Sequence, residues 1–244
     1  MNTKPAISLI IPCNNEERNL RPLVAAIQSA IEPLALAYEI IITDDASQDD
    51  SWEIIKRLAA GDPRIRGQRL ASNCGQSAAI WAGIKAAHGR YLVTMDADLQ
   101  NDPADLPKFI EALKRFDCVC GTRIQSRSLG DNFTKRASSR IANWVRNTVS
   151  GDTMSDIACC FRAFRRECVE DLRFFQGMHR LLPMLLRMEG YTVSEIAVTH
   201  RPRLSGSTHY GIWDRLWPAL HDLMAVCWMK KRRLRYLIAE KVNL

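Results

Sequence analysis

The chain has 244 residues, of which 47% are hydrophobic and 25% are charged, and its formal net charge is +7 at pH 7. This length accommodates one large α/β domain with a full core, with or without a small appendage, and the composition is ordinary for a globular protein. The excess of positive charge favours an anionic partner, whether phosphates, nucleic acid or an anionic membrane face.

Cysteine spacing and apolar runs narrow the class of protein further. The eight cysteines include no C-x-x-C pair, so metal-ligand spacing is absent and reduced, mostly buried thiols are expected, which fits the cytosol. No secretory signal is expected, because the first apolar stretch, 6–11, is short and ends at Pro12. No run of about 18 uncharged apolar residues occurs, so no helix is expected to span a bilayer.

The first half of the chain alternates strand and helix patterns. Short apolar runs predict buried strands at 7–11, 39–43, 65–70, 91–95 and 118–120. Helical periodicity predicts helices at 16–31, 76–87 and 103–115. A further helix is expected to end at Leu58, with Ser47 or Asp49 as its N-terminal cap. This alternation predicts an α/β fold, with a mostly parallel sheet covered by helices on both faces.

The pattern changes after Gly121. A polar loop is expected first, and then helices at 133–149, 177–188 and 212–239 and strands at 160–164 and 191–198. The helix at 133–149 is basic and amphipathic. We therefore expect a catalytic-type α/β domain over residues 1–211 and an amphipathic basic segment over 212–244.

The segment from Met95 to Gln100, MDADLQ, is the most informative part of the sequence. It places Asp96 and Asp98 just beyond the end of a buried strand, where α/β sheets bind ligands. Two such carboxylates suit a hard cation, Mg²⁺ or Mn²⁺, with coordination positions left for the diphosphate of a nucleotide-sugar. The alternative is a solvated acidic turn.

Polar motifs end five successive predicted strands: 12–17 (PCNNEE), 43–49 (TDDASQD), 73–76 (NCGQ), 95–100 (MDADLQ) and 121–123 (GTR). In this order and spacing they resemble family 2 inverting glycosyltransferases of the GT-A fold, and most of all the polyprenyl-phosphate glycosyltransferases, which include dolichyl-phosphate mannose synthase. The resemblance spans roughly residues 6–211. It implies a Rossmann-like GT-A fold and metal-dependent transfer of a sugar from a UDP- or GDP-sugar to a polyprenyl phosphate, by one in-line displacement.

The resemblance also implies roles for individual residues. Asp45 is expected to accept hydrogen bonds from the base or ribose, and Asp98 to bind the metal directly. Asp96 is expected to reach the metal through water or to hold the ribose and sugar, and Gln100 to lie near metal or substrate. The metal set is Asp96, Asp98 and Gln100, and the expected donor-binding set is Pro12, Asn15, Glu16, Asp45, Asn73, Gly75, Asp96, Ser207 and His209. Glu16 is alternatively a helix N-terminal charge, and Gln100 a polar turn residue.

The role expected of Asp156 depends on whether the acceptor is a hydroxyl or a phosphate. A hydroxyl acceptor would need a general base there. A lipid phosphate has a second pKa near 6, so it needs cations to hold it instead, with Arg123, Arg127 and Arg203 as candidates. Asp156 would then orient an arginine or the sugar. The expected catalytic set is Asp98, Gln100, Arg123, Asp156 and Arg203.

The segment 200–211 resembles the Arg-x-x-Gly-x-Ser-Lys-Tyr loop that closes over the diphosphate in the same group. His209 stands where Lys is usual, so activity is expected to fall above about pH 7, and Arg or Lys there to flatten the profile. Asn14 and Ala46 are two further departures, where Tyr and Gly are common, and neither removes a charge.

The C-terminal segment fits a helix that lies in the headgroup layer at the cytoplasmic face of a membrane. One helical face gathers apolar residues: Ile212, Trp213, Leu216, Trp217, Leu220, Leu223, Met224, Cys227 and Trp228. A basic cluster, 230–233 with Arg235, follows this face, and the helix at 133–149 offers a second contact. A homo-oligomer interface or a helix docked on the core is the alternative.

Other classes of protein fit less well. Nucleic acid is not expected as a partner, because no binding motif is evident and the acidic strand ends would repel phosphates without a metal. A dehydrogenase would need a Gly-x-Gly-x-x-Gly turn where 12–15 has PCNN. A transferase acting on a saccharide or glycolipid hydroxyl, and a non-catalytic scaffold that binds nucleotide-sugars, remain alternatives.

Overall fold

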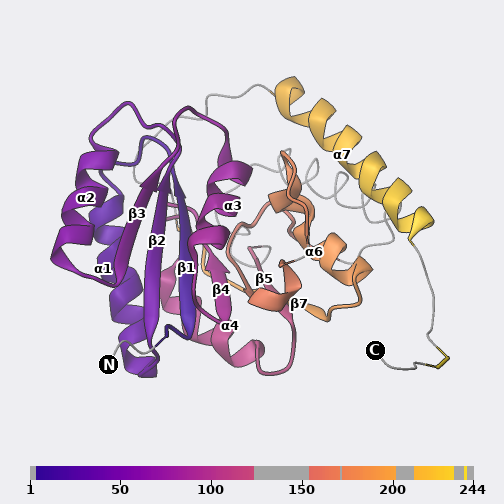
Figure 1. Cartoon of the computed structure of the whole chain (residues 1–244), viewed down its shortest axis with the longest axis horizontal. Helices are drawn as coiled ribbons and strands as arrows, with labels where there is room; N and C mark the ends of the chain where they lie inside the picture. Colours follow the sequence, from indigo (N-terminus) through magenta and orange to yellow (C-terminus); the bar gives the residue numbers. More distant parts are fainter. Residues whose placement is uncertain (1–3, 124–153, 171, 202–211, 234–238, 241–244) are drawn as a thin grey trace.

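The structure, a computed structural model, describes residues 4–123, 154–170, 172–201, 212–233 and 239–240, and only the backbone of 212–219. The described residues form one sheet of seven strands (Figure 1): β1 (Ile7–Cys13), β2 (Tyr38–Asp44), β3 (Ile65–Arg69), β4 (Tyr91–Thr94), β5 (Cys118–Thr122), β6 (Arg162–Arg165) and β7 (Val193–Ala197). The α-helices are α1 (Leu20–Ile31), α2 (Ser51–Gly61), α3 (Gln76–Ala86), α4 (Leu106–Ala112), α6 (Met178–Met188) and α7 (Ile212–Arg232). Short 3₁₀ turns are η1 (Glu32–Leu34), η2 (Pro103–Asp105) and η4 (Arg166–Cys168).

The strands lie in the order β3-β2-β1-β4-β6-β5-β7. Parallel pairing joins β3, β2, β1 and β4 in turn, and also β5 with β7. Strand β6 runs antiparallel to both of its neighbours, β4 and β5. The expected mostly parallel α/β sheet is confirmed, and β6 makes it mixed.

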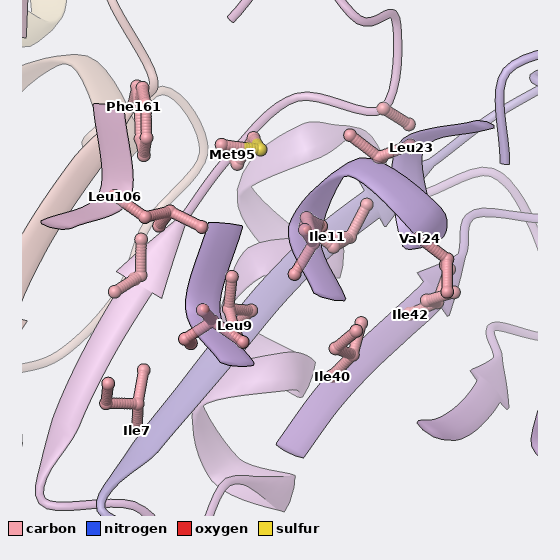
Figure 2. Packing of buried hydrophobic residues seen from close by; sticks show 14 of the residues in the cluster. Ile7, Leu9, Ile11, Leu23, Val24, Ile40, Ile42, Met95, Leu106 and Phe161 are labelled. Atoms are coloured by element: carbon pink, nitrogen blue, oxygen red, sulfur yellow. The ribbon is translucent and has the colours of Figure 1, made fainter. Parts of the chain in front are cut away.

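Strand β1 shows why this sheet needs helices on both faces. All seven of its residues are buried, as expected of a strand covered on two sides. Because side chains alternate along a strand, Leu9 and Ile11 point into the core beneath α1, whereas Ile10 joins the core beneath α3 and α6. Figure 2 shows Leu9, Ile11, Leu23 and Val24 within one cluster of buried side chains.

Helix α7 packs against α6 at the edge of the second core (Figure 1). Leu223 and Val226 are buried there, with exposures of 8% and 0%. The opposite side of α7 exposes Leu220, Met224 and Trp228 to 42%, 50% and 62%. The apolar face expected from the sequence is therefore divided: Leu223 belongs to the core, because its side of the helix packs on α6.

Several expected boundaries were wrong by a few residues. Helix α1 begins at Leu20 rather than at residue 16, because the backbone N–H groups of Glu16 and Glu17 donate to Ser51 and Asp49 of the next loop. The N-cap residue of α2 is Asp50, and its side chain makes no capping hydrogen bond, so the expected cap at Ser47 or Asp49 was wrong. Asp49, one residue earlier, accepts from the N–H of Ser51. Ser47 accepts instead from the N–H of Asn15.

Other expectations concern the second half of the chain. Helix α7 ends at Arg232, short of the expected residue 239. The expected helix at 133–149 lies outside the described residues, and the domain boundary at 211 stays a prediction. Within the part of the chain that the structure describes, no helix is both long and apolar enough to cross a membrane.

Candidate active site

The C-terminal ends of the parallel strands open into a cleft of about 710 Å³. Seven of the residues expected at the site line it: Pro12, Glu16, Asp45, Asp96, Asp98, Gln100 and Arg123. Strand order explains why they meet. Asp45 follows β2, the two aspartates follow β4 two strands away, and Arg123 follows β5 two strands further on. Neighbouring strands are about 4.8 Å apart, so each step spans about 10 Å.

Asp45 joins three loops at the first end of the cleft. Its carboxylate accepts hydrogen bonds from the backbone N–H groups of Cys74 (2.7 Å) and Gly75 (2.8 Å), and its own N–H donates to the carbonyl of Cys13. The side chain is 3% exposed. Asp44, by contrast, is turned into the protein, where Arg69 Nε lies 3.0 Å from its Oδ2. Of the two acids that end β2, only Asp45 therefore faces the cleft.

Two other expected donor-binding residues hold the loops rather than line the cleft. Asn15 donates its N–H to Ser47 Oγ and accepts from the N–H of Gln48, which ties the loop after β1 to the loop after β2. Gly75 has φ +85°, a conformation that glycine adopts without strain, and its N–H reaches Asp45. Asn73 is exposed and lies outside the lining of the cleft.

The paired acids after β4 sit in the middle of the cleft. Gln76 Nε2 donates to Asp96 Oδ1 at 2.7 Å, and the N–H of Gln100 donates to Asp98 Oδ1 at 3.1 Å. Burial and the negative charge of Asp98 raise the pKa of Asp96 to about 6. Leu99 has φ +60°, which is rare for a residue with a side chain and concentrates backbone strain at this turn.

The donor groups at this turn fit a divalent cation. Two carboxylates that repel one another, beside the amide of Gln100, supply the oxygen ligands that Mg²⁺ and Mn²⁺ prefer. Among the described residues, no three His, Cys, Asp or Glu side chains converge into a closed metal site. Asp96, Asp98 and Gln100 would hold such a cation from one side, with positions open for phosphate oxygens.

Arg123 and Asp156 form a bidentate ion pair at the other end of the cleft. Arg123 Nε and Nη2 donate to the two carboxylate oxygens at 2.7 and 3.0 Å. The side chains are 11% and 4% exposed. Burial works against the charge of Arg123, but the Asp156 carboxylate raises its pKa above the ordinary value. Glu195 holds the loop before this acid by accepting from the N–H groups of Ser155 and Asp156.

Ten residues that the sequence analysis did not assign to the site also line the cleft, and they include Gln76, Cys160, His179 and Arg180. Gln76 lies in the third motif, next to Gly75, so its position was a usable signal. The other three lie in the strand expected at 160–164 and the helix expected at 177–188, and only the tertiary fold brings them to the cleft. Arg203, Ser207, His209 and Arg127 lie outside the described residues.

Comparison with known proteins identifies the family. Residues 8–173 match the model of glycosyl transferase family 2. The chain is 32% identical over 237 residues to undecaprenyl-phosphate 4-deoxy-4-formamido-L-arabinose transferase of Aeromonas hydrophila, with coverage of 97% of this chain and 72% of the relative. It is also 32% identical to the transferase of the same name from Yersinia pestis, with coverage of 98% and 72%. The chain belongs to glycosyl transferase family 2.

Solved structures agree on the fold. Glucosyl-3-phosphoglycerate synthase of Mycobacterium tuberculosis, in complex with Mn²⁺, UDP and glucosyl-3-phosphoglycerate, superposes with a TM-score of 0.64 at 18% identity, covering 93% of this chain and 80% of that one. A mannosyltransferase of Pyrobaculum calidifontis, in complex with GDP-Man and Mn²⁺, has a TM-score of 0.60 at 18% identity, with coverage of 96% and 66%. The expected GT-A type of fold is confirmed.

Proposed function

We propose that the chain is a metal-dependent inverting glycosyltransferase that moves a sugar from a nucleotide-sugar to a polyprenyl phosphate. The observation that carries this proposal is the row of functional groups along one cleft: Asp45, then Asp96 with Asp98, then Arg123. A nucleoside end, a diphosphate and a phosphate acceptor need these groups in this order. The names of the undecaprenyl-phosphate transferases, at 32% identity, support the same acceptor.

Each group of residues in the cleft has its own role in the transfer. Asp45 binds the base or ribose, and Asp98, Asp96 and Gln100 hold Mg²⁺ or Mn²⁺, which when bound neutralises charge on the leaving diphosphate. An oxygen of the acceptor phosphate attacks the anomeric carbon as the bond from that carbon to the nucleoside diphosphate breaks. Arg123 lies on the acceptor side and holds the phosphate in line. No proton has to leave the acceptor, because its phosphate is largely ionised at neutral pH.

The state of Asp156 favours a phosphate over a hydroxyl acceptor. Both of its carboxylate oxygens accept from Arg123, and it is 3% exposed. A general base must reach the proton that it removes, whereas this carboxylate is bound to a guanidinium. We therefore assign Asp156 to the orientation of Arg123.

The deciding experiment measures nucleoside-diphosphate release from a panel of UDP- and GDP-sugars with Mg²⁺ or Mn²⁺, with and without undecaprenyl phosphate. Release that requires the lipid phosphate, and that falls by about 10²- to 10³-fold or more in Asp98→Asn, supports the proposal. Turnover on an added saccharide without lipid would move the acceptor to a hydroxyl. Donor binding without any turnover across the panel would favour the scaffold alternative.

We further propose that α7 lies on an anionic membrane surface at the cytoplasmic face. Its outward side exposes Leu220, Met224 and Trp228, and its last turn carries Lys230 and Lys231. Each basic residue near such a surface contributes about 1 kcal/mol. Binding to anionic vesicles that weakens with salt, and that Trp228→Ala reduces, supports this contact. A concentration-dependent dimer that leaves vesicles unbound would favour the homo-oligomer alternative.

The segment that includes Arg203, Ser207 and His209 stays a proposal from the sequence resemblance. It is expected to close over the diphosphate, with His209 in the place of a lysine. A profile of activity that falls above about pH 7 and that His209→Lys flattens supports the role. A profile that His209→Lys leaves unchanged contradicts it.

A further inference from the structure

The first turn of α6 brings two unassigned side chains, His179 and Arg180, to the wall of the cleft. A buried guanidinium fixes this turn from below. Arg162, 2% exposed, donates to the carbonyl of His179 and, at 2.7 Å, to the carbonyl of Ile157. Gly177 starts the turn with φ +87°, and its N–H donates to Ser77 Oγ of α3. The positions of His179 and Arg180 are thus set by bonds to β6 and α3.

His179 enters the cleft as a neutral hydrogen-bond donor. Its Nδ1 lies 2.7 Å from Ser77 Oγ. Ser77 Oγ also accepts from the N–H of Gly177. We assign the Ser77 hydrogen to His179 Nδ1, which places the ring proton on Nε2, the nitrogen that Ser77 leaves available. Burial and the nearby charges of Arg180 and Arg162 lower the pKa of His179 to about 3. The ring is only 8% exposed, and it lines the cleft.

Arg180 differs from Arg123 in what surrounds its charge. Arg123 is bound at two points by Asp156, whereas no carboxylate in the described part of the chain lies within ion-pair distance of Arg180. The charge of Arg180 acts on Asp222 of α7, where it works against the rise in pKa that burial causes. The Oδ2 atom of Asp222 lies against Gly177, 2.3 Å from where a Cβ on that glycine would stand. Arg180 therefore brings a cation to the cleft whose guanidinium makes no hydrogen bond or ion pair with the described residues.

The position of α6 indicates which substrate Arg180 meets. Helix α6 packs against α7 (Figure 1). The first turn of α6 lines the cleft, and α7 carries the exposed apolar residues Leu220, Met224 and Trp228. Asp45, which is assigned to the nucleoside, follows β2 at the other end of the row. A substrate that arrives from a membrane on the α7 side reaches Arg180 before it reaches Asp45.

We propose that Arg180, together with the Nε2–H of His179, binds the phosphate group of the polyprenyl phosphate acceptor; this inference rests on the proposed function. A guanidinium fork matches the geometry of a phosphate. Arg180 adds one cation to Arg123, and His179 adds a neutral donor rather than a third cation, so the attacking oxygen keeps its nucleophilicity. Arg180 and His179 thereby act as binding residues for the acceptor, on the side of the cleft opposite the donor nucleoside.

The test compares binding of farnesyl phosphate, a short soluble probe, with binding of farnesol and of UDP or GDP with Mn²⁺, all to the full chain. We expect Arg180→Gln to weaken farnesyl phosphate by about tenfold to hundredfold, the range for loss of a hydrogen-bonded charge, and Arg180→Lys to weaken it less. Affinity for the nucleotide should stay within about twofold. Arg173→Gln is the matched control, because Arg173 is exposed, precedes α6 and lies outside the cleft lining.

Two results would overturn the role of Arg180: unchanged affinity of Arg180→Gln for farnesyl phosphate, or an equal loss of affinity for the nucleotide, which would make it a donor-binding residue. A wild-type chain that binds farnesyl phosphate no better than farnesol would instead overturn the phosphate acceptor itself, and the role of Arg180 with it. Thermal unfolding of each variant establishes that the loss concerns binding, and Arg180→Lys provides a second variant that retains the charge.

Discussion

The two ends of the cleft are held together by different kinds of contact. At the donor end, side chains bind the backbone of neighbouring loops: Asp45 accepts from two N–H groups, and Asn15 and Ser51 join the loops after β1 and β2. At the acceptor end, charged side chains dominate, namely the Arg123–Asp156 pair and the buried Arg162. The donor end is a frame built from short motifs, and the acceptor end is built from residues far apart in the sequence.

This difference has a functional consequence. A nucleotide offers many fixed hydrogen-bonding groups, which a frame of backbone-bonded loops can match without rearrangement. A lipid phosphate offers one charged group on a flexible chain, so the acceptor end needs placed cations. Buried ion pairs are costly to break, whereas single hydrogen bonds contribute about 1 kcal/mol. The two ends should therefore respond differently to substitution.

The largest effect is expected at the acceptor end. Asp156→Ala leaves the guanidinium of Arg123 buried without its partner, which should lower the free energy of unfolding by about 3–5 kcal/mol. Urea denaturation measures this change. The matched control is Glu53→Gln, which removes the exposed Lys56–Glu53 pair on α2 and should leave the urea midpoint unchanged. Equal midpoints for Asp156→Ala and the wild type would show that the pair does not hold this end together.

At the donor end, Asp45→Asn should have a smaller effect on stability and a larger one on nucleotide binding. An amide can accept from one of the two N–H groups of Cys74 and Gly75 but turns its own N–H₂ toward the other, at a cost of about 1–3 kcal/mol. Urea denaturation and UDP binding with Mn²⁺ are the measurements. Asp50→Asn, an exposed residue of the same loop, is the control. UDP affinity equal to that of the wild type would remove Asp45 from the donor site.

The same contrast explains what the sequence alone could predict. The strands β1, β2 and β4 carry continuous apolar runs, and their ends carry the motifs, so Asp45, Asp96 and Asp98 could be placed together from parallel topology. Gln76 was within reach of the same argument. The antiparallel direction of β6 was not, because no local pattern distinguishes it from a parallel strand.

The acceptor end shows why long-range contacts escape sequence reasoning. His179 bonds to Ser77, 102 residues away, and its helix, α6, has an apolar pattern that indicates only core packing. Arg123 and Asp156 were both expected at the site, and an arginine was one of two partners expected for Asp156, but no local pattern selects Arg123 at a separation of 33 residues. Helix α7 was expected to have one apolar face, whereas packing on α6 buries Leu223 and leaves Leu220 exposed.

An effect of intermediate size is expected for His179, whose contribution to the free energy of unfolding should depend on pH. Its folded-state pKa lies near 3, below the ordinary value of 6.5, so below pH 6.5 the unfolded chain takes up a proton that the folded chain does not. The stability that this residue contributes is therefore complete above pH 6.5 and is lost as the pH falls, by about 1.4 kcal/mol per pH unit. His179→Gln lacks this dependence.

The measurement for His179 is the difference in unfolding free energy between the wild type and His179→Gln. Urea denaturation at pH 7.5 and at pH 5.5 provides it, and other titrating groups cancel in the difference. We expect the difference to shift in favour of the variant at the lower pH. A difference that does not change with pH would mean that His179 takes up its proton as readily in the folded chain as in the unfolded one, which would make it a further cation at the acceptor end at pH 5.5.

The smallest effect is expected at Ala46, in the loop after Asp45. Its φ is +55°, a conformation that costs a residue with a side chain about 1–2 kcal/mol. Ala46→Gly relieves this strain but frees the unfolded chain by about 0.4–1 kcal/mol, so a net gain in stability of about 0.5 kcal/mol is expected. The family resemblance also favours this substitution, because glycine is common at the position of Ala46.

Two other alanine-to-glycine changes serve as controls for the change in stability measured for Ala46→Gly. Ala35, exposed and with φ +51°, should gain a similar amount on change to glycine, and Ala25, exposed within α1, should lose about 1 kcal/mol. If Ala46→Gly stabilises the chain as Ala35→Gly does, but alone weakens UDP binding, the alanine stiffens the donor loop in the conformation that binds. If Ala46→Gly destabilises the chain, the loop is held by contacts of the methyl group rather than strained, and the view of the donor end as a preformed frame gains strength.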